Sequence, residues 1–128
     1  LPISMNSTLF FDDIAYHDFE GPSLYLEERD RLRKSLGTKK AMILRNHGLL
    51  TVGGTVAEAF IRLYRLEQAC RIQLDAAAAG ELNLLDDKIA RKSGHDTSRF
   101  MESEAAYGQL EFNALMRKLD KTDNSYRH

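Results

Sequence analysis

The sequence predicts an α/β fold in which a central, mostly antiparallel sheet is covered by helices. Two apolar runs of strand length, beginning at Ala41 and Leu49, flank a short polar turn. This pattern is typical of adjacent antiparallel strands. A long run without glycine or proline follows over 55–79, and another helical pattern lies near the C-terminus. We expect both helices to cover the sheet.

Length, net charge and cysteine content indicate which classes of protein the sequence fits. The 128 residues allow one domain, 1–128, with a real hydrophobic core. A net charge of -1 gives no reason to expect nucleic acid or an anionic membrane as a partner. No segment approaches the roughly 20 apolar residues that span a bilayer, and the start lacks a signal-peptide pattern, so we expect a cytoplasmic protein. Cys70 is the single cysteine and is expected to be a small buried apolar residue.

The first third of the chain contains a short extended piece at 1–4 and two apolar clusters, 9–11 and 14–16. We expect these clusters to enter the core as a strand or a short irregular element. Gly21 and Pro22 break the chain, and a charged helix is expected over 26–36, where acidic residues come early and basic residues late. That order matches the helix dipole, and Gly37 is a natural stop.

The polar turn between the two predicted strands carries His47. A neutral imidazole can bind a metal or act as an acid or base, and a strand-end turn leaves its tip open to a ligand. Asn46 and Gly48 both tolerate left-handed backbone conformations. Because Asn-x-Gly turns are common, the turn by itself is also explained as a hairpin with an incidental histidine.

The long helix is expected to begin with a capping box, in which the Thr55 hydroxyl accepts from the Glu58 amide and the Glu58 carboxylate reaches back to the Thr55 amide. Glu67 interrupts the apolar stripe and is expected at its solvated margin. Gly80 is expected to end the helix. The stripe recurs at three- and four-residue steps: Val56, Phe60, Leu63, Glu67, Cys70 and Leu74.

Beyond Gly80, we expect one or two helical turns over 86–92 and a loop over 93–97 with an exposed His95. A helix is then predicted over 98–119, since apolar residues keep helical spacing there. Gly108 lies on that apolar stripe, which indicates close approach to another backbone.

At the level of whole segments, the sequence resembles the class II aldolase/adducin family and its bacterial adducin-like branch. The resemblance rests on Ile43-Leu44-Arg45-Asn46-His47-Gly48-Leu49-Leu50-Thr51-Val52-Gly53, on the following helix to Gly80, and on Ile14-Ala15-Tyr16-His17-Asp18-Phe19-Glu20-Gly21 upstream. It implies a three-layer α/β/α fold of which this chain is the C-terminal part, incomplete at its N-terminus.

The resemblance also implies a site. Family members hold zinc through three histidines, and His47 is the ligand that this chain can supply. The other two ligands, a His-x-His pair, and an acid/base glutamate are expected upstream of Leu1, because this sequence contains no His-x-His. Tyr16 matches a catalytic tyrosine that reaches into the neighbouring subunit's active site; the alternative is a ring packed in the core or an interface. A second metal cluster of His17, Asp18 and Glu20 is disfavoured, because neighbouring residues in an extended segment point to opposite faces.

Two functions remain open. The first is a zinc-dependent aldolase, or a related lyase or epimerase, that acts on a small sugar phosphate or hydroxycarbonyl compound. The second is a noncatalytic adducin-like domain that serves binding or assembly. For both candidate functions, the resemblance implies a homo-oligomer, commonly a tetramer, and family members have their active sites at subunit boundaries.

Overall fold

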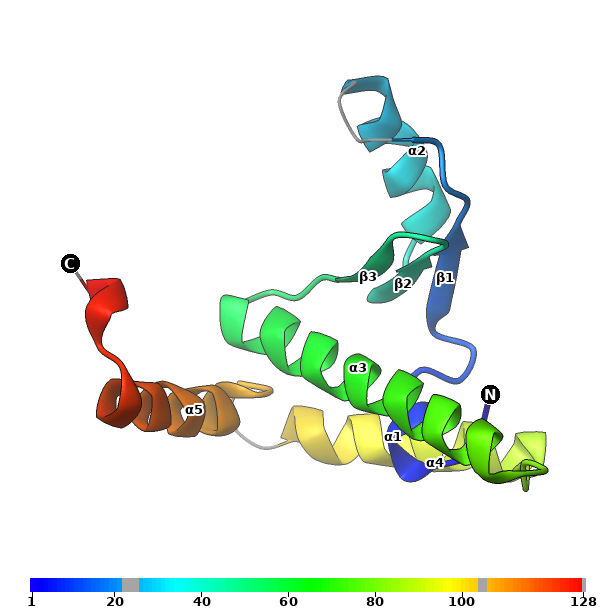
Figure 1. Ribbon diagram of the computed structural model, residues 1–128. Helices are drawn as coiled ribbons and strands as arrows, with labels where there is room; N and C mark the ends of the chain where they lie inside the picture. The colour runs from blue at the N-terminus through cyan, green and yellow to red at the C-terminus, as the bar shows by residue number, and fades with distance from the viewer. Residues whose placement is uncertain (22–25, 104–105, 128) are drawn as a thin grey trace.

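The computed structural model describes residues 1–21, 26–103 and 106–127 (Figure 1). Within these ranges no helix combines the length and apolar character needed to cross a membrane. The elements in chain order are α1 (Met5–Thr8), β1 (Ile14–His17), α2 (Leu26–Leu36), β2 (Ala41–Leu44), β3 (Gly48–Thr51), α3 (Val56–Ala79), α4 (Asp87–Ser103), α5 (Gln109–Thr122) and a 3-10 turn (Ser125–Arg127).

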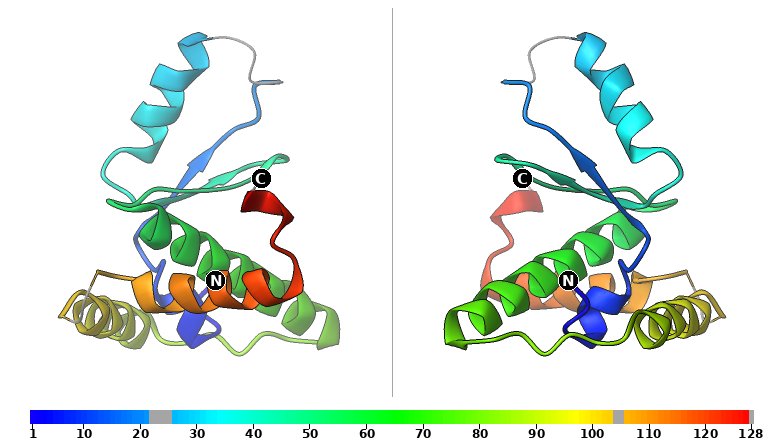
Figure 2. Two further views of the ribbon diagram at one scale, coloured as in Figure 1. Left: turned by 90° about the vertical axis from the view of Figure 1, so that its left-hand side faces the viewer. Right: turned by 90° about the vertical axis from the view of Figure 1, so that its right-hand side faces the viewer.

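The architecture is α/β and layered, as predicted. A three-stranded sheet in the order β1-β2-β3 lies between α2 on one face and α3 on the other (Figures 1 and 2). The helices α4 and α5 and the short α1 lie on the far side of α3 from the sheet. The long helix α3 is therefore the centre of the molecule, with neighbours along much of its circumference.

The sheet is mixed. Strands β2 and β3 pair antiparallel, with Ala41 opposite Thr51 and Leu44 opposite Gly48, as predicted. Strand β1 pairs parallel with β2, with Ile14 beside Ala41. A parallel pair needs a crossover connection, and α2, whose bounds match the predicted 26–36, supplies it.

The core lies between α3 and the sheet. Phe10, Ala41 and Leu66 form its buried cluster, and partly buried neighbours, Cys70 among them, pack around it. The residues predicted to form the buried stripe of α3 are not the ones that are buried. Val56 and Leu74, at the two ends of the predicted stripe, are 75% and 70% exposed. The helix has neighbours on more than one side, so small residues take the closest contacts. The buried positions of α3 are Ala57, Ile61, Leu66 and Ala69.

The start of α3 shows how the hairpin joins the helix. The Glu58 amide donates to Thr55 Oγ1 at 3.1 Å, as predicted. The Glu58 carboxylate, however, accepts from the Gly54 amide at 2.6 Å and not from Thr55. It also pairs with Arg62 at 2.6 Å. A Cβ on Gly53 would lie 2.7 Å from the Ala59 nitrogen, so glycine is needed where the chain passes α3.

The C-terminal third differs from the prediction. Helix α4 runs without interruption through Gly94, where a loop was expected. A side chain at Gly94 would clash with the carbonyl oxygen of Thr8, so this glycine permits α4 to approach α1 closely and does not end the helix. His95 is exposed, as expected, but on this helix.

The predicted helix over 98–119 is divided. Its positions 104–105 lie outside the described residues, and Gly108, in the left-handed region at φ 77°, caps a separate helix, α5. The expected close approach at Gly108 is confirmed, since a Cβ there would lie 2.9 Å from the Ile61 side chain and 3.1 Å from the Ala57 carbonyl oxygen. Helix α5 packs against α3 through Phe60 and Phe112, and not on the sheet as expected.

Candidate functional site

The turn between β2 and β3 presents His47 to solvent. Its amide donates to the Leu44 carbonyl at 3.0 Å, which closes the turn. Asn46 takes the left-handed conformation at φ 59°, whereas Gly48 does not have a positive φ and has open space around it. The turn therefore uses the left-handed conformation that Asn46 tolerates, and it does not use the same freedom at Gly48.

The end of β1 and the residues that follow it hold this turn in place. The Arg45 amide donates to the His17 carbonyl at 2.9 Å. The Arg45 guanidinium pairs with Asp18 at 2.6 Å. The ring of Phe19 meets the His47 imidazole edge-on, with centroids 6.5 Å apart. The imidazole is thus placed by a tight turn at the end of a sheet and by an aromatic neighbour, which is suitable geometry for a ligand-binding residue.

A small cavity of about 20 Å³ lies beside this turn, and both His17 and His47 line it. His17 is 8% exposed, and its Nδ1 lies 2.9 Å from Ser35 Oγ. Its Nε2 is buried and has no hydrogen-bond partner within the described part of the chain; Glu20 Oε1 lies 3.7 Å away. Buried polar atoms normally have a partner, and a cavity of this size admits one water.

Glu20, at the rim of the same cavity, is ionised at neutral pH. A hydrogen bond from Arg31, with a 2.5 Å ion pair, holds the pKa of Glu20 below its usual range, although partial desolvation opposes the effect. The polar side of the cavity therefore combines a carboxylate with an imidazole nitrogen that no described residue hydrogen-bonds.

The donors at this turn do not form a metal centre on their own. In the ranges that the structure describes, no three histidine, cysteine, aspartate or glutamate side chains converge closely enough to hold a metal ion. Zinc sites need three or four converging donors. The exposed imidazole of His47 has the chemistry of a zinc ligand, and a centre built on it would require donors from outside the described residues.

Tyr16 is 53% exposed, and its phenol is not packed in the core of this chain. The Arg45 guanidinium lies over its ring, 5.5 Å from the centroid. Tyr16 shares a large apolar groove with residues of β2 and α3, Ile43 and Leu66 among them. His47 does not line this groove; it lines the cavity of about 20 Å³ described above. The structure thus gives Tyr16 and His47 different surroundings within one chain.

Sequence reasoning did not assign the partners that define this site. Arg45 contacts both Asp18 and Tyr16, and the Phe19 ring contacts His47. These contacts arise because β1 and β2 pair in parallel, with His17 beside Leu44. No local spacing signal could have revealed them, since they depend on the alignment of two strands separated by a helix.

Comparison with known proteins identifies the family. Residues 1–74 match the Class II Aldolase and Adducin N-terminal domain. The chain belongs to the class II aldolase/adducin family. It is 38% identical, over 99% of its length, to a Pseudomonas aeruginosa protein named for class 2 aldolases, covering 50% of that protein. It is 37% identical to human beta-adducin over 100% of its length, covering 20% of that protein.

Solved structures of other proteins share the fold. An aldolase II superfamily protein from Pseudomonas syringae matches with a TM-score of 0.81 and 41% identity over 100% of this chain and 50% of that chain. An L-fuculose 1-phosphate aldolase from Glaciozyma antarctica matches with a TM-score of 0.63 and 34% identity, over 74% of this chain and 35% of that chain. The chain spans about half the length of the bacterial relatives that it matches.

Proposed function

We propose that the protein is a zinc-dependent aldolase-type carbon-carbon lyase, or a related epimerase, that acts on a small sugar phosphate or hydroxycarbonyl compound. This chain supplies only part of the site. The observation that carries the proposal is the exposed imidazole of His47 on a well-defined turn, in a chain that belongs to the class II aldolase/adducin family. The L-fuculose 1-phosphate aldolase among the similar structures supports the substrate class.

His47 is the proposed metal ligand of this chain. The turn hydrogen bond to Leu44 and the contact with Phe19 orient the imidazole, so little ordering is needed when a metal binds. The remaining ligands are expected upstream of Leu1. When bound, zinc supplies a Lewis acid that polarises a substrate carbonyl.

Tyr16 is the proposed acid/base residue. Its phenol is exposed, and Arg45 restrains the ring through a cation–π contact. A phenol in this position can donate a proton to a substrate oxygen or accept one from it. Because Tyr16 and His47 line different cavities, we propose that each works in a different active site of a homo-oligomer, a tetramer by family resemblance.

The exposed apolar surface supports an oligomer. One hollow beside the edge strand β3 is lined by Leu49 and by Phe60, Leu63 and Tyr64 of α3. The three α3 side chains are between 39% and 52% exposed. Apolar groups gathered at a sheet edge are typical of a surface covered in an assembly.

The second candidate function is a noncatalytic adducin-like domain for binding or assembly. The likeness to beta-adducin over the whole length of this chain favours it. The two candidates differ in whether the full-length protein holds a metal at His47 and cleaves a substrate.

Activity is tested on the full-length protein loaded with zinc. Cleavage of L-fuculose 1-phosphate and other ketose 1-phosphates is followed by enzymatic reduction of the released aldehyde. Tyr16→Phe should lower kcat by about 100-fold or more with little change in KM, as expected for loss of an acid/base group. Tyr126→Phe, near the C-terminus, is the matched control. No cleavage of any hydroxycarbonyl compound by metal-loaded protein would favour the assembly domain.

A further inference from the structure

The large apolar groove that Tyr16 lines has a volume of about 480 Å³. Its walls come from the first residues of the chain, from β1 and β2, and from the second half of α3. Leu66 in the groove belongs to the buried core, whereas Leu1 and Leu74 are 62% and 70% exposed. The groove therefore leaves apolar surface open where the sequence predicted a buried stripe. Its apolar lining includes Leu1, Phe10, Ile14, Ile43, Leu66 and Leu74.

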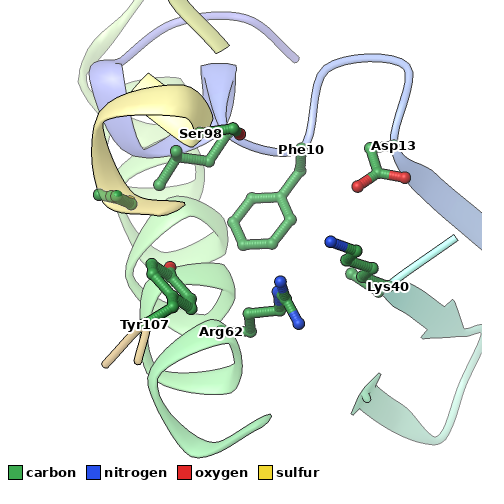
Figure 3. Close-up of a pocket in the computed structure, with 9 residues that line it drawn as sticks. Phe10, Asp13, Lys40, Arg62, Ser98 and Tyr107 are labelled. Carbon is green, nitrogen blue, oxygen red and sulfur yellow. The ribbon is translucent and has the colours of Figure 1, made fainter. Parts of the chain in front are cut away.

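The groove is suited to apolar groups and not to a charged ligand. Its charged lining residue, Asp12, pairs with Arg91. Phe10 lines both this groove and a smaller polar cavity of about 60 Å³, which Figure 3 shows. The Arg62 guanidinium of that cavity is also paired within the chain, with Glu58 at 2.6 Å. Open surface without a partner in the described chain is thus apolar on the groove side of Phe10.

The strand that borders the groove is open as well. Within the described residues β1 pairs with β2 alone, so it is an edge strand of the sheet. Ile14 of this strand lines the groove. Native proteins normally cover edge strands and large apolar patches. We therefore expect one covering segment to shield both the groove and the edge beside it.

The surroundings of Leu1 indicate which segment this is. Leu1 lines the groove, and its nitrogen donates to Gln73 Oε1 of α3 at 2.6 Å. A peptide N–H at this position can make the same bond, so a segment that precedes Leu1 would leave from the groove itself. This chain covers 50% and 49% of two bacterial relatives, so proteins of this kind carry enough additional chain to fill it.

We propose that the apolar groove is an interface within the full-length protein, occupied by apolar side chains of the segment that precedes Leu1. The segment packs against Phe10 and Leu74 and is fastened in this way to α3 and to the sheet that carries His47. The proposal does not rest on the proposed aldolase activity, because a noncatalytic domain needs the same cover.

Photo-cross-linking of the full-length protein tests which segment occupies the groove. The photoreactive residue benzoyl-phenylalanine replaces Leu74, and mass spectrometry locates the cross-links. Unlabelled and 15N-labelled subunits are mixed, so that links within a subunit differ in mass from links between subunits. We expect links within a subunit to residues that precede Leu1. Links between subunits would assign the groove to a second copy and overturn the proposal, as would links confined to residues 1–128 or to residues after His128.

A charge placed in the groove tests whether it is covered. Leu74→Glu in the full-length protein should lower the midpoint of thermal unfolding by about 4–8 °C, because the carboxylate would be buried without a partner. Leu110→Glu is the matched control, since Leu110 is 69% exposed on α5 and does not line the groove. It should shift the midpoint by less than about 2 °C. Equal shifts in the two variants, or no shift for Leu74→Glu, would show an open groove and overturn the proposal.

Discussion

Replacing Gly53 with alanine should destabilise the junction between the hairpin and α3. A Cβ there would lie 2.7 Å from the Ala59 nitrogen, so the backbone must move by about 0.7 Å to restore a contact of 3.4 Å. Overpacking of this kind costs about 1–3 kcal/mol, and the smaller entropy of the unfolded alanine chain offsets about 0.4–1 kcal/mol. We expect a net loss of about 1–2 kcal/mol in the free energy of unfolding.

The matched control is Gly54→Ala. At Gly54 the nearest atom to a Cβ is Glu58 Oε2 at 3.3 Å, the end of a flexible side chain. Neither glycine has a positive φ, so backbone strain does not distinguish them. Urea unfolding of the full-length protein, followed by circular dichroism, gives both values. Equal stabilities of the two variants, or a Gly53→Ala variant as stable as the unaltered protein, would refute the reasoning.

Two further predictions concern polar groups that are buried or partly buried. Burial by itself would raise the pKa of Glu58, but the hydrogen bond from the Gly54 amide and the pairing with Arg62 outweigh it, and the pKa is lowered overall. This carboxylate therefore stabilises the fold above its unfolded pKa of about 4.3, and the contribution is lost as the pH falls through the folded value. Glu58→Gln should be less stable at pH 7, with a difference that narrows toward pH 3 in urea titrations; a difference independent of pH would contradict this. Ser35→Ala removes the partner of His17 Nδ1 and leaves both ring nitrogens without one among the described residues, which should cost about 1–3 kcal/mol in the same assay. A loss below about 0.5 kcal/mol would show that water replaces the serine.

The sequence predicted the elements whose bounds depend on residues close together in the chain. Helix α2 begins and ends at the predicted residues, because its charges match the helix dipole and Gly37 ends it at φ 57°. The capping residue Thr55 predicted the start of α3, and the apolar runs at Ala41 and Leu49 predicted the antiparallel hairpin. Each of these depends on residues that are close in sequence.

Features that depend on distant contacts were missed. Helix α1, which has only four residues, was also missed, although the capping bonds between Ser4 and Ser7 are local. Gly94 lies inside α4 at a point where Thr8 leaves no room for a side chain, and nothing near Gly94 in the sequence indicates this contact. The position of His47 on its turn was predictable because the turn is local. Its contact with Phe19 was not, because it requires the parallel pairing of β1 with β2.

The most direct test of the proposed function is metal analysis of the full-length protein as purified, with two histidine variants. His47→Ala removes the proposed ligand, whereas His95→Ala removes an exposed histidine on α4. Our account predicts near-stoichiometric zinc in the unaltered protein and in His95→Ala, and its loss from a folded, assembled His47→Ala. A full-length protein without zinc, or equal zinc in both variants, would contradict it and leave the adducin-like assembly domain as the better description.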